Sequence, residues 1–255
     1  MLIVQGGQRF RVGQAAQPFV LPYLDDFDAY ELTPDFGAKN FDGEILLDEG
    51  TELLAIEWQT SGQQLKLTHD LSRLKVNLKR FPLAKKELLN RAIGKKTRLI
   101  LDATGGWGQD ALLFACFGYE VLSQERNPLM AIMLLQLMDH VRQVYGSQFS
   151  EFTSPNAQFG SSFELSESDI KQFDCVYLDP MFPPKRKQSA ASNKYMQFSQ
   201  AIIGADVDAT ELLQYCLQAG AKRIVVKRPA HAAPLLAKPS DIFASKLVHY
   251  DVYLG

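Results

Sequence analysis

Residues 179–183, with the sequence Asp-Pro-Met-Phe-Pro, combine residue types that can activate an amino group for attack on an electrophile. They follow an apolar run, residues 173–178, that is typical of a buried strand. An exocyclic amine on a nucleobase is a poor nucleophile because its lone pair is delocalised into the ring. The Asp179 carboxylate and the Pro180 carbonyl can each accept one of its N–H groups and so direct the lone pair. Phe182 offers a flat apolar face on which an extruded base can stack.

This segment matches the general Asp/Asn-Pro-Pro-Tyr/Phe signature of amino-methyltransferases except at one position. Met181 stands where the signature has its second proline. The alternative is a proline-rich loop that leaves a strand and carries an aspartate with only a capping role. The residue types predict methylation of an exocyclic nitrogen, with Asp179, Pro180 and Phe182 as the catalytic residues.

A glycine-rich turn lies upstream, between an apolar strand at residues 98–103 and a helix that begins near Asp110. Glycines such as Gly105 let the backbone turn tightly and approach a ligand without a Cβ atom. The N-terminus of the helix then offers free N–H groups. Taken alone, this turn also fits an ordinary connection from a strand to a helix.

Acidic residues around the turn indicate which ligand it would take. Glu125 ends the second strand about 20 residues after the turn, where an acid in this kind of sheet binds ribose hydroxyls. Asp102 precedes the turn, and the glycine spacing differs from the dinucleotide pattern G-x-G-x-x-G. A carboxylate here suits the ammonium of a methionine and would repel a pyrophosphate. The pattern predicts S-adenosylmethionine, although Asp110 also fits a first-turn acid favoured by the helix dipole.

From residue 98 onward, predicted strands alternate with predicted helices, which favours an α/β fold with a doubly wound parallel sheet. The predicted strands are residues 98–103, 120–123, a segment near 158, 175–178, 223–227 and a β-rich end at 246–253. The predicted helices are residues 110–118, a long one from 128, 164–170 and 209–219. Short β-prone pieces at 2–4, 53–58, 64–67 and 74–78 come before a helical pattern at 82–93. We expect a small β-rich N-terminal domain at 1–80 and a Rossmann-like domain at 81–255.

The bulk composition sets limits on the class of protein. The 255 residues are 46% hydrophobic and 22% charged, with a formal net charge of −2, which argues against a general nucleic-acid coating protein. No apolar run approaches the roughly 20 residues of a membrane span, and the start does not read as a secretory signal. The three cysteines, Cys116, Cys175 and Cys216, lie in apolar runs without metal spacing and predict buried free thiols. We expect a cytoplasmic protein with no structural metal.

Four segments together resemble the RsmJ family, and the likeness covers roughly residues 98–255. They are residues 102–110 (Asp-Ala-Thr-Gly-Gly-Trp-Gly-Gln-Asp), 125–128 (Glu-Arg-Asn-Pro), 176–183 (Val-Tyr-Leu-Asp-Pro-Met-Phe-Pro) and 223–229 (Arg-Ile-Val-Val-Lys-Arg-Pro). The run with Met181 is this family's own variant of the signature. The resemblance implies a class I methyltransferase fold, S-adenosyl-L-methionine as cofactor, and methylation of a guanosine N2 near the 3′ end of 16S ribosomal RNA. Its partner would be this RNA or the assembling small subunit.

The resemblance also implies positions for cofactor contacts. They fall at Gln109 and Asp110, Glu125 and Arg126, Ser161 and Ser162, and Asp179, beside Asp102 and Gly105 of the turn. The family usually has Arg in the place of Gln109, and Ala-Gly-Leu-Gly where this chain has Gly-Gly-Trp-Gly at 105–108. On its own, Arg126 also fits a surface residue.

Two groups of cations follow predicted strands at the same edge of the sheet. Lys185, Arg186 and Lys187 come directly after the Asp-Pro loop, and Lys227 and Arg228 end the next strand. We expect them to bind the phosphates that flank an extruded base. A role in surface solubility is the alternative for either group.

Three other functions remain open at this point. The same chemistry can act on adenine N6 of DNA or RNA, or on a glutamine side chain of a protein. A nicotinamide oxidoreductase would share the sheet, although the glycine spacing differs. A non-catalytic RNA-binding assembly factor would keep only the fold.

Overall fold

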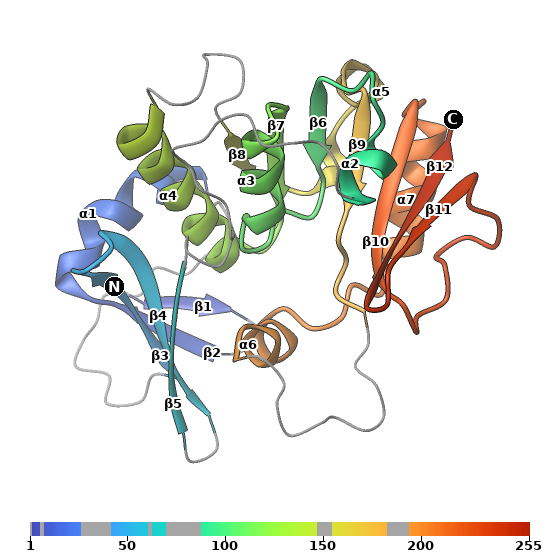
Figure 1. Ribbon diagram of the computed structural model, residues 1–255. Coiled ribbons are helices and arrows are strands. Elements are labelled where there is room, and N and C mark those ends of the chain that lie inside the picture. Colours follow the sequence, from blue (N-terminus) through green and yellow to red (C-terminus); the bar gives the residue numbers. More distant parts are fainter. Residues whose placement is uncertain are drawn as a thin grey trace.

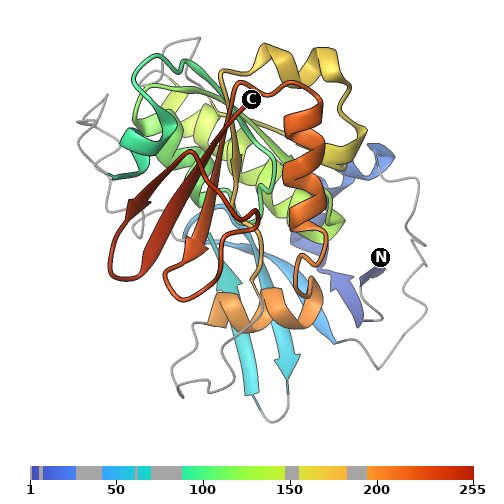
Figure 2. The same cartoon turned by 90° about the vertical axis from the view of Figure 1, so that its right-hand side faces the viewer.

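The computed structural model describes residues 2–5, 8–26, 42–60, 63–69, 88–146, 155–182 and 194–255. These residues form two sheets that lie side by side, a smaller N-terminal sheet and a larger one that carries the rest of the chain (Figure 1). Figure 2 shows the molecule turned by 90°, with α6 (Lys194–Ile202) beside the smaller sheet and α7 (Ala209–Gln218) beside the larger one.

The larger sheet has seven strands in the order β11-β12-β10-β9-β6-β7-β8. Their bounds are β6 (Leu99–Asp102), β7 (Glu120–Glu125), β8 (Asn156–Phe159), β9 (Cys175–Leu178), β10 (Arg223–Pro229), β11 (Asp241–Ala244) and β12 (Val248–Leu254). The strands from β8 to β10 are parallel, while β12 is antiparallel to β10 and β11 is antiparallel to β12. The predicted doubly wound α/β fold is confirmed. The edge is antiparallel because β11 leads back to β12 through a short turn, without a crossover helix.

Helices cover both faces of this sheet. They are α2 (Leu88–Ile93), α3 (Gln109–Cys116), α4 (Pro128–Tyr145), α5 (Glu167–Gln172) and α7 (Ala209–Gln218), with a 3-10 turn η5 (Ser162–Glu164) before α5. Residues of α2, α3 and α4 share one core cluster with Ile100 and Val225, and residues of α5 and α7 share another with Leu101 and Ile224. Neighbouring residues of one strand therefore face opposite helix layers, which explains the continuous apolar runs in the sequence.

The smaller sheet has the strand order β1-β2-β3-β4-β5, in which β2 and β3 are parallel and the other pairs antiparallel. Its elements are β1 (Leu2–Gln5), β2 (Gln8–Val12), η1 (Gln14–Ala16), α1 (Gln17–Val20), η2 (Leu21–Asp26), β3 (Gly43–Asp48), β4 (Leu53–Thr60) and β5 (Gln63–Thr68). The predicted strands at 2–4, 53–58 and 64–67 are confirmed. The strand predicted at 74–78 and the first half of the helix predicted at 82–93 lie outside the described residues, while the second half is α2.

A shared core joins the two sheets. Ile56 and Trp58 of β4 pack in one cluster with Met130 of α4 and Phe198 of α6 (Lys194–Ile202). The sequence analysis did not predict α6, although Tyr195, Phe198 and Ile202 follow the spacing of one helical face. The N-terminal sheet therefore rests on helices that belong to the rest of the chain.

The three cysteines are buried free thiols, as predicted. Among the described helices, none has the length and apolar character to cross a membrane.

A buried ion pair ties β10 to β12. Arg228 donates from Nε to Asp251 Oδ2 over 2.5 Å and from Nη2 to Oδ1 over 3.0 Å, with 5% and 0% of the two side chains exposed. Arg228 also donates to the Ala232 carbonyl over 2.6 Å. Because both charges are buried, removing one leaves the other without compensation.

We expect Asp251→Ala to lower the free energy of unfolding by about 3–5 kcal/mol, because it leaves the Arg228 guanidinium buried and unpaired. Urea unfolding followed by circular dichroism measures the change. Glu167→Ala is the control, because it breaks an exposed pair with Lys171 and should leave stability nearly unchanged. If the two variants unfold at the same urea concentration, the buried pair contributes no more to stability than the exposed one.

Candidate active site

The described residues enclose a pocket at the carboxyl ends of the parallel strands, with a cavity of about 210 Å³. Residues from the glycine turn, the end of β7, the Asp-Pro loop and the end of β10 line it. The lining includes nearly all of the predicted cofactor and catalytic residues: Asp102, Gly105, Gln109, Asp110, Glu125, Arg126, Ser161, Ser162, Asp179 and Pro180. The tertiary structure thus brings together segments from residue 102 to residue 227, as expected for an open α/β sheet.

The glycine turn packs tightly against β7 and α4. A Cβ atom on Gly105 would lie 2.7 Å from Ser123 Oγ and 2.8 Å from Leu134 Cδ2. Gly108, which precedes α3, has φ of 70°, in the left-handed region that favours glycine. The geometry of the turn therefore requires glycine at positions 105 and 108.

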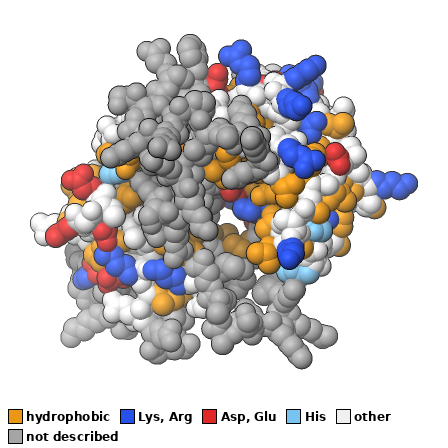
Figure 3. Space-filling view, in the orientation of Figure 1, with side chains coloured by type: hydrophobic (Ala, Val, Ile, Leu, Met, Phe, Trp, Pro, Cys, Tyr) orange, Lys and Arg blue, Asp and Glu red, His pale blue; other side chains and the backbone are white. Residues whose placement is uncertain are grey.

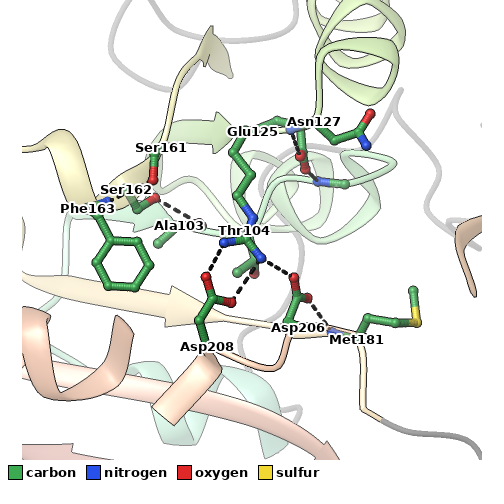
Figure 4. Close-up of polar contacts among 12 residues, drawn as sticks. Ala103, Thr104, Glu125, Asn127, Ser161, Ser162, Phe163, Met181, Asp206 and Asp208 are labelled. Carbon is green, nitrogen blue, oxygen red and sulfur yellow. Dashed lines mark hydrogen bonds and ion pairs between the residues drawn. The ribbon is translucent and has the colours of Figure 1, made fainter. Parts of the chain in front are cut away.

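Glu125 holds this turn in place. Its carboxylate accepts hydrogen bonds from the backbone N–H of Gly106 and of Asn127, each over 2.6 Å (Figure 4). Desolvation raises the pKa of Glu125 above its usual range, while these two N–H groups act to lower it. Each carboxylate oxygen keeps a further lone pair that can accept a ribose hydroxyl, as the prediction requires.

Asp102 lies deeper, at the end of β6. Its carboxylate accepts from Ser123 Oγ over 3.0 Å and from the Thr104 N–H over 3.3 Å, and only 2% of the residue is exposed. Desolvation, together with the charge of Asp110, raises the pKa of Asp102 to about 7. Thr104 Oγ1 in turn accepts from the Asp179 N–H over 2.7 Å, so the glycine turn is bonded to the Asp-Pro loop.

Lys227 joins two acids across the pocket. Its ammonium donates to Asp110 Oδ2 over 2.7 Å and to Asp179 Oδ2 over 2.8 Å, and Tyr177 donates its hydroxyl to Asp110 Oδ2 over 2.6 Å. Desolvation in the pocket raises the pKa of Asp179 to about 6, against the opposing effect of Lys227. Desolvation acts on Asp110 too, but Lys227 brings its pKa below the usual range. Despite desolvation, the two carboxylates hold the pKa of Lys227 well above its ordinary value.

These contacts correct the prediction for the cations near the end of β10. Lys227 lies on the predicted edge, but its ammonium faces the acids of the pocket, with 26% of the side chain exposed. The prediction that Arg228 contacts RNA is wrong, because its guanidinium is buried against Asp251. Lys185, Arg186 and Lys187 lie outside the described residues. On the face in Figure 3, Lys and Arg side chains gather at the upper right, near the C-terminus and α5.

Ser161 and Ser162 form the wall opposite the Asp-Pro loop (Figure 4). Ser161 caps η5, since its hydroxyl accepts from the Phe163 N–H over 3.3 Å and its N–H donates to Glu164 Oε2 over 3.2 Å. Ser162 donates its hydroxyl to the Ala103 carbonyl over 2.8 Å. Ser161 therefore shapes the pocket wall through local contacts, while Ser162 bonds this wall to the residue that follows β6, 59 positions earlier in the chain.

Arg126 lines the pocket and binds two acids that the sequence analysis missed. Its guanidinium donates to Asp206 Oδ1 over 2.6 Å and to both oxygens of Asp208. Asp206 also accepts from the Met181 N–H (Figure 4). Residues 203–208 carry no recognisable motif, so no local signal indicates these contacts.

Trp107 connects the glycine turn to the smaller sheet. Its ring packs edge to face on His69 and Tyr195, with centroid distances of 5.5 Å and 5.1 Å, and its Nε1–H donates to Ser199 Oγ over 3.3 Å. Ser199 and Ile203 also line the pocket. The smaller sheet and α6 thus support one wall of the site.

Comparisons with known proteins identify the family. A family model described as "Putative SAM-dependent methyltransferase" matches residues 36–255. The chain belongs to this family of SAM-dependent methyltransferases. Its cofactor is S-adenosylmethionine, and the nicotinamide alternative is set aside.

Relatives of the family are named "Ribosomal RNA small subunit methyltransferase J", which confirms the resemblance found in the sequence. The protein from Coxiella burnetii is 37% identical over 172 residues, which span 66% of this chain and 66% of that protein. The protein from Pseudoalteromonas translucida is 36% identical over 183 residues, 69% of this chain and 71% of that protein. A solved SAM-dependent methyltransferase from Neisseria gonorrhoeae shares the fold, with a TM-score of 0.68 and 23% identity over 96% of this chain and 95% of that one.

The charges of the pocket fit the family's cofactor. Six carboxylate side chains line it against two cationic ones, Arg126 and Lys227. S-adenosylmethionine supplies an electrophilic methyl group on a sulfonium, and its net charge is positive because an ammonium accompanies its single carboxylate. An excess of carboxylates at the strand ends attracts such a molecule and repels nucleotide phosphates.

We expect Gly105→Ala to weaken the binding of S-adenosylhomocysteine about tenfold, because the new Cβ pushes the turn away from Ser123 and Leu134. Titration calorimetry measures the affinity. Gly146→Ala is the matched control, since a Cβ there meets no atom within 4 Å. If Gly105→Ala binds S-adenosylhomocysteine as tightly as wild type, the glycine turn is not part of the cofactor site.

Proposed function

We propose that this protein transfers the methyl group of S-adenosylmethionine to the exocyclic N2 of a guanosine in 16S ribosomal RNA. The observation that supports this most is the position of Asp179 and Pro180 at the pocket wall, beside the family's cofactor site. The relatives named for ribosomal RNA support the choice of substrate, although the aligned part spans only 66% of the first of them.

The contacts of Asp179 suggest how the amine is held. Lys227 donates to Oδ2, so Oδ1 is the oxygen available to accept one amine N–H. The Pro180 carbonyl accepts the other, which directs the nitrogen lone pair along a single line. Phe182 follows at the edge of the described loop and offers the stacking face for the base.

The same carboxylate can take up the released proton. After transfer the nitrogen carries one proton too many, and Asp179, with a pKa of about 6, is a suitable acceptor at Oδ1. Lys227 then keeps the pair of acids compensated, because its charge lies between Asp110 and Asp179.

RNA contacts outside the pocket remain part of the proposal. We retain Lys185, Arg186 and Lys187 as the phosphate contacts, because they follow the Asp-Pro loop in the chain. We also retain the division into domains 1–80 and 81–255 and a cytoplasmic site of action, where small subunits assemble. Neither depends on the geometry of the pocket.

We expect labelled cofactor to transfer its methyl group to small subunits or 16S RNA, and mass mapping to place it on guanosine N2, at the family's position 1516. Asp179→Ala should lower the rate about 100-fold or more and weaken S-adenosylhomocysteine binding much less, because it removes an acceptor used in the transition state. Transfer to DNA adenine or to a protein glutamine instead would replace the proposed substrate. Binding of RNA without any transfer would favour the assembly-factor alternative.

The rate should also fall at acidic pH. Ionised Asp179 is the active form, so activity is present above its pKa of about 6 and is lost as the pH falls through that value. Lys227→Gln removes a charge that lowers this pKa. The pH at which activity is lost should therefore rise by about one unit or more. Single-turnover rates between pH 5 and 9 test this, with Lys171→Gln on the exposed face of α5 as control. If the rate of Lys227→Gln falls at the same pH as that of wild type, Lys227 is not the group that lowers the pKa of Asp179.

A further inference from the structure

Asp206 binds both backbone polar groups of Met181. The Met181 N–H donates to Asp206 Oδ2 over 2.6 Å (Figure 4). The Asp206 N–H in turn donates to the Met181 carbonyl over 3.1 Å. Met181 belongs to the Asp-Pro loop, whereas Asp206 lies in the connection between α6 and α7. A residue far along the chain thus holds the centre of the loop.

The departure of this loop from the general signature makes the contact possible. A proline at position 181 would have no N–H, and its ring would occupy the space of the hydrogen bond. Met181 restores a backbone donor, and the bond to a carboxylate replaces the stiffness that a proline ring supplies. Met181 and Asp206 therefore act as a matched pair.

The geometry of the peptide unit connects this pair to the reaction. The unit between Pro180 and Met181 is planar, so its C=O and N–H point in opposite directions when it is trans. We propose that Asp206 is a positioning residue that aims the Pro180 carbonyl at the substrate amine by binding the Met181 N–H from behind. This role rests on the proposed function, since the Pro180 carbonyl is the acceptor there.

Arg126 in turn fixes Asp206. Its Nη2 donates to Asp206 Oδ1 over 2.6 Å, which leaves Oδ2 directed at Met181. Arg126 follows Glu125, which holds the glycine turn, so the two halves of the pocket meet at Asp206. Asp208 binds the same guanidinium, and within the described part of the chain it has no recorded hydrogen bond to Met181.

Amide hydrogen exchange tests the contact without any turnover. We expect Asp206→Ala to speed exchange at the Met181 amide about tenfold or more, since a hydrogen bond to a charged acceptor is lost. Asp208→Ala is the matched control, because it removes a carboxylate from Arg126 but keeps the acceptor for Met181, and exchange should change less. If Asp206→Ala unfolds the protein, Asp206→Asn serves instead and should give a smaller increase. Unchanged protection in a folded Asp206 variant would overturn the proposal.

A double-mutant cycle tests the positioning role. Asp206→Ala should lower kcat about 10- to 100-fold with little change in KM, because a misaimed acceptor affects the transition state. In a Met181→Ala background, which keeps the N–H, the loss should be the same. In a Met181→Pro background, which lacks it, Asp206→Ala should cost little or restore activity. An equal loss in both backgrounds would show that Asp206 acts by another route.

The two readouts separate this inference from the proposed function. If wild type shows no transfer to any RNA, the proposed function fails, yet the exchange experiment still reports on the Asp206 contact. If wild type transfers methyl groups and Asp206→Ala does so at the same rate, only the positioning role fails.

Discussion

The pocket depends on the compensation of negative charge that the fold gathers in one place. Asp102, Asp110, Glu125 and Asp179 all face it, and such acids repel one another when water is excluded. Lys227 makes this arrangement possible, since its ammonium lies within 2.8 Å of oxygens from two of them. The remaining negative charge suits a positively charged cofactor. The excess of carboxylates, which by itself would destabilise the pocket, therefore also favours a positively charged ligand.

Support for the Asp-Pro loop and the glycine turn comes from side chains that take no part in the proposed methyl transfer. Trp107 anchors the glycine turn on α6 and the smaller sheet, and Arg126 joins the end of β7 to residues before α7. Because α6 also packs on β4, the N-terminal sheet stiffens one wall of the pocket. Preorganised acceptors need such rigid surroundings, since a small misplacement costs much of the rate.

Prediction from sequence succeeded where local pattern and physical requirement coincide. The glycine turn and the Asp-Pro loop are each a short motif, Glu125 ends β7, and strand and helix periodicity places all three at one edge of the sheet. It failed to find the acidic partners of Lys227 and Arg228, both of which were predicted to bind RNA phosphates. Their partners, Asp110 and Asp251, are 117 and 23 residues away, and nothing local distinguishes a paired cation from a solvated one.

By itself, the sequence determined the fold class and the cofactor, and it indicated the residues that we propose for the reaction, because these depend on short motifs that can be recognised in order along the chain. Only the tertiary structure decided which charges compensate one another and what holds the catalytic loop. Asp206 and Met181 are 25 residues apart, and their contact exists because the connection before α7 returns to the edge of the sheet. Burial and pairing arise from packing in three dimensions, so they are absent from the linear pattern.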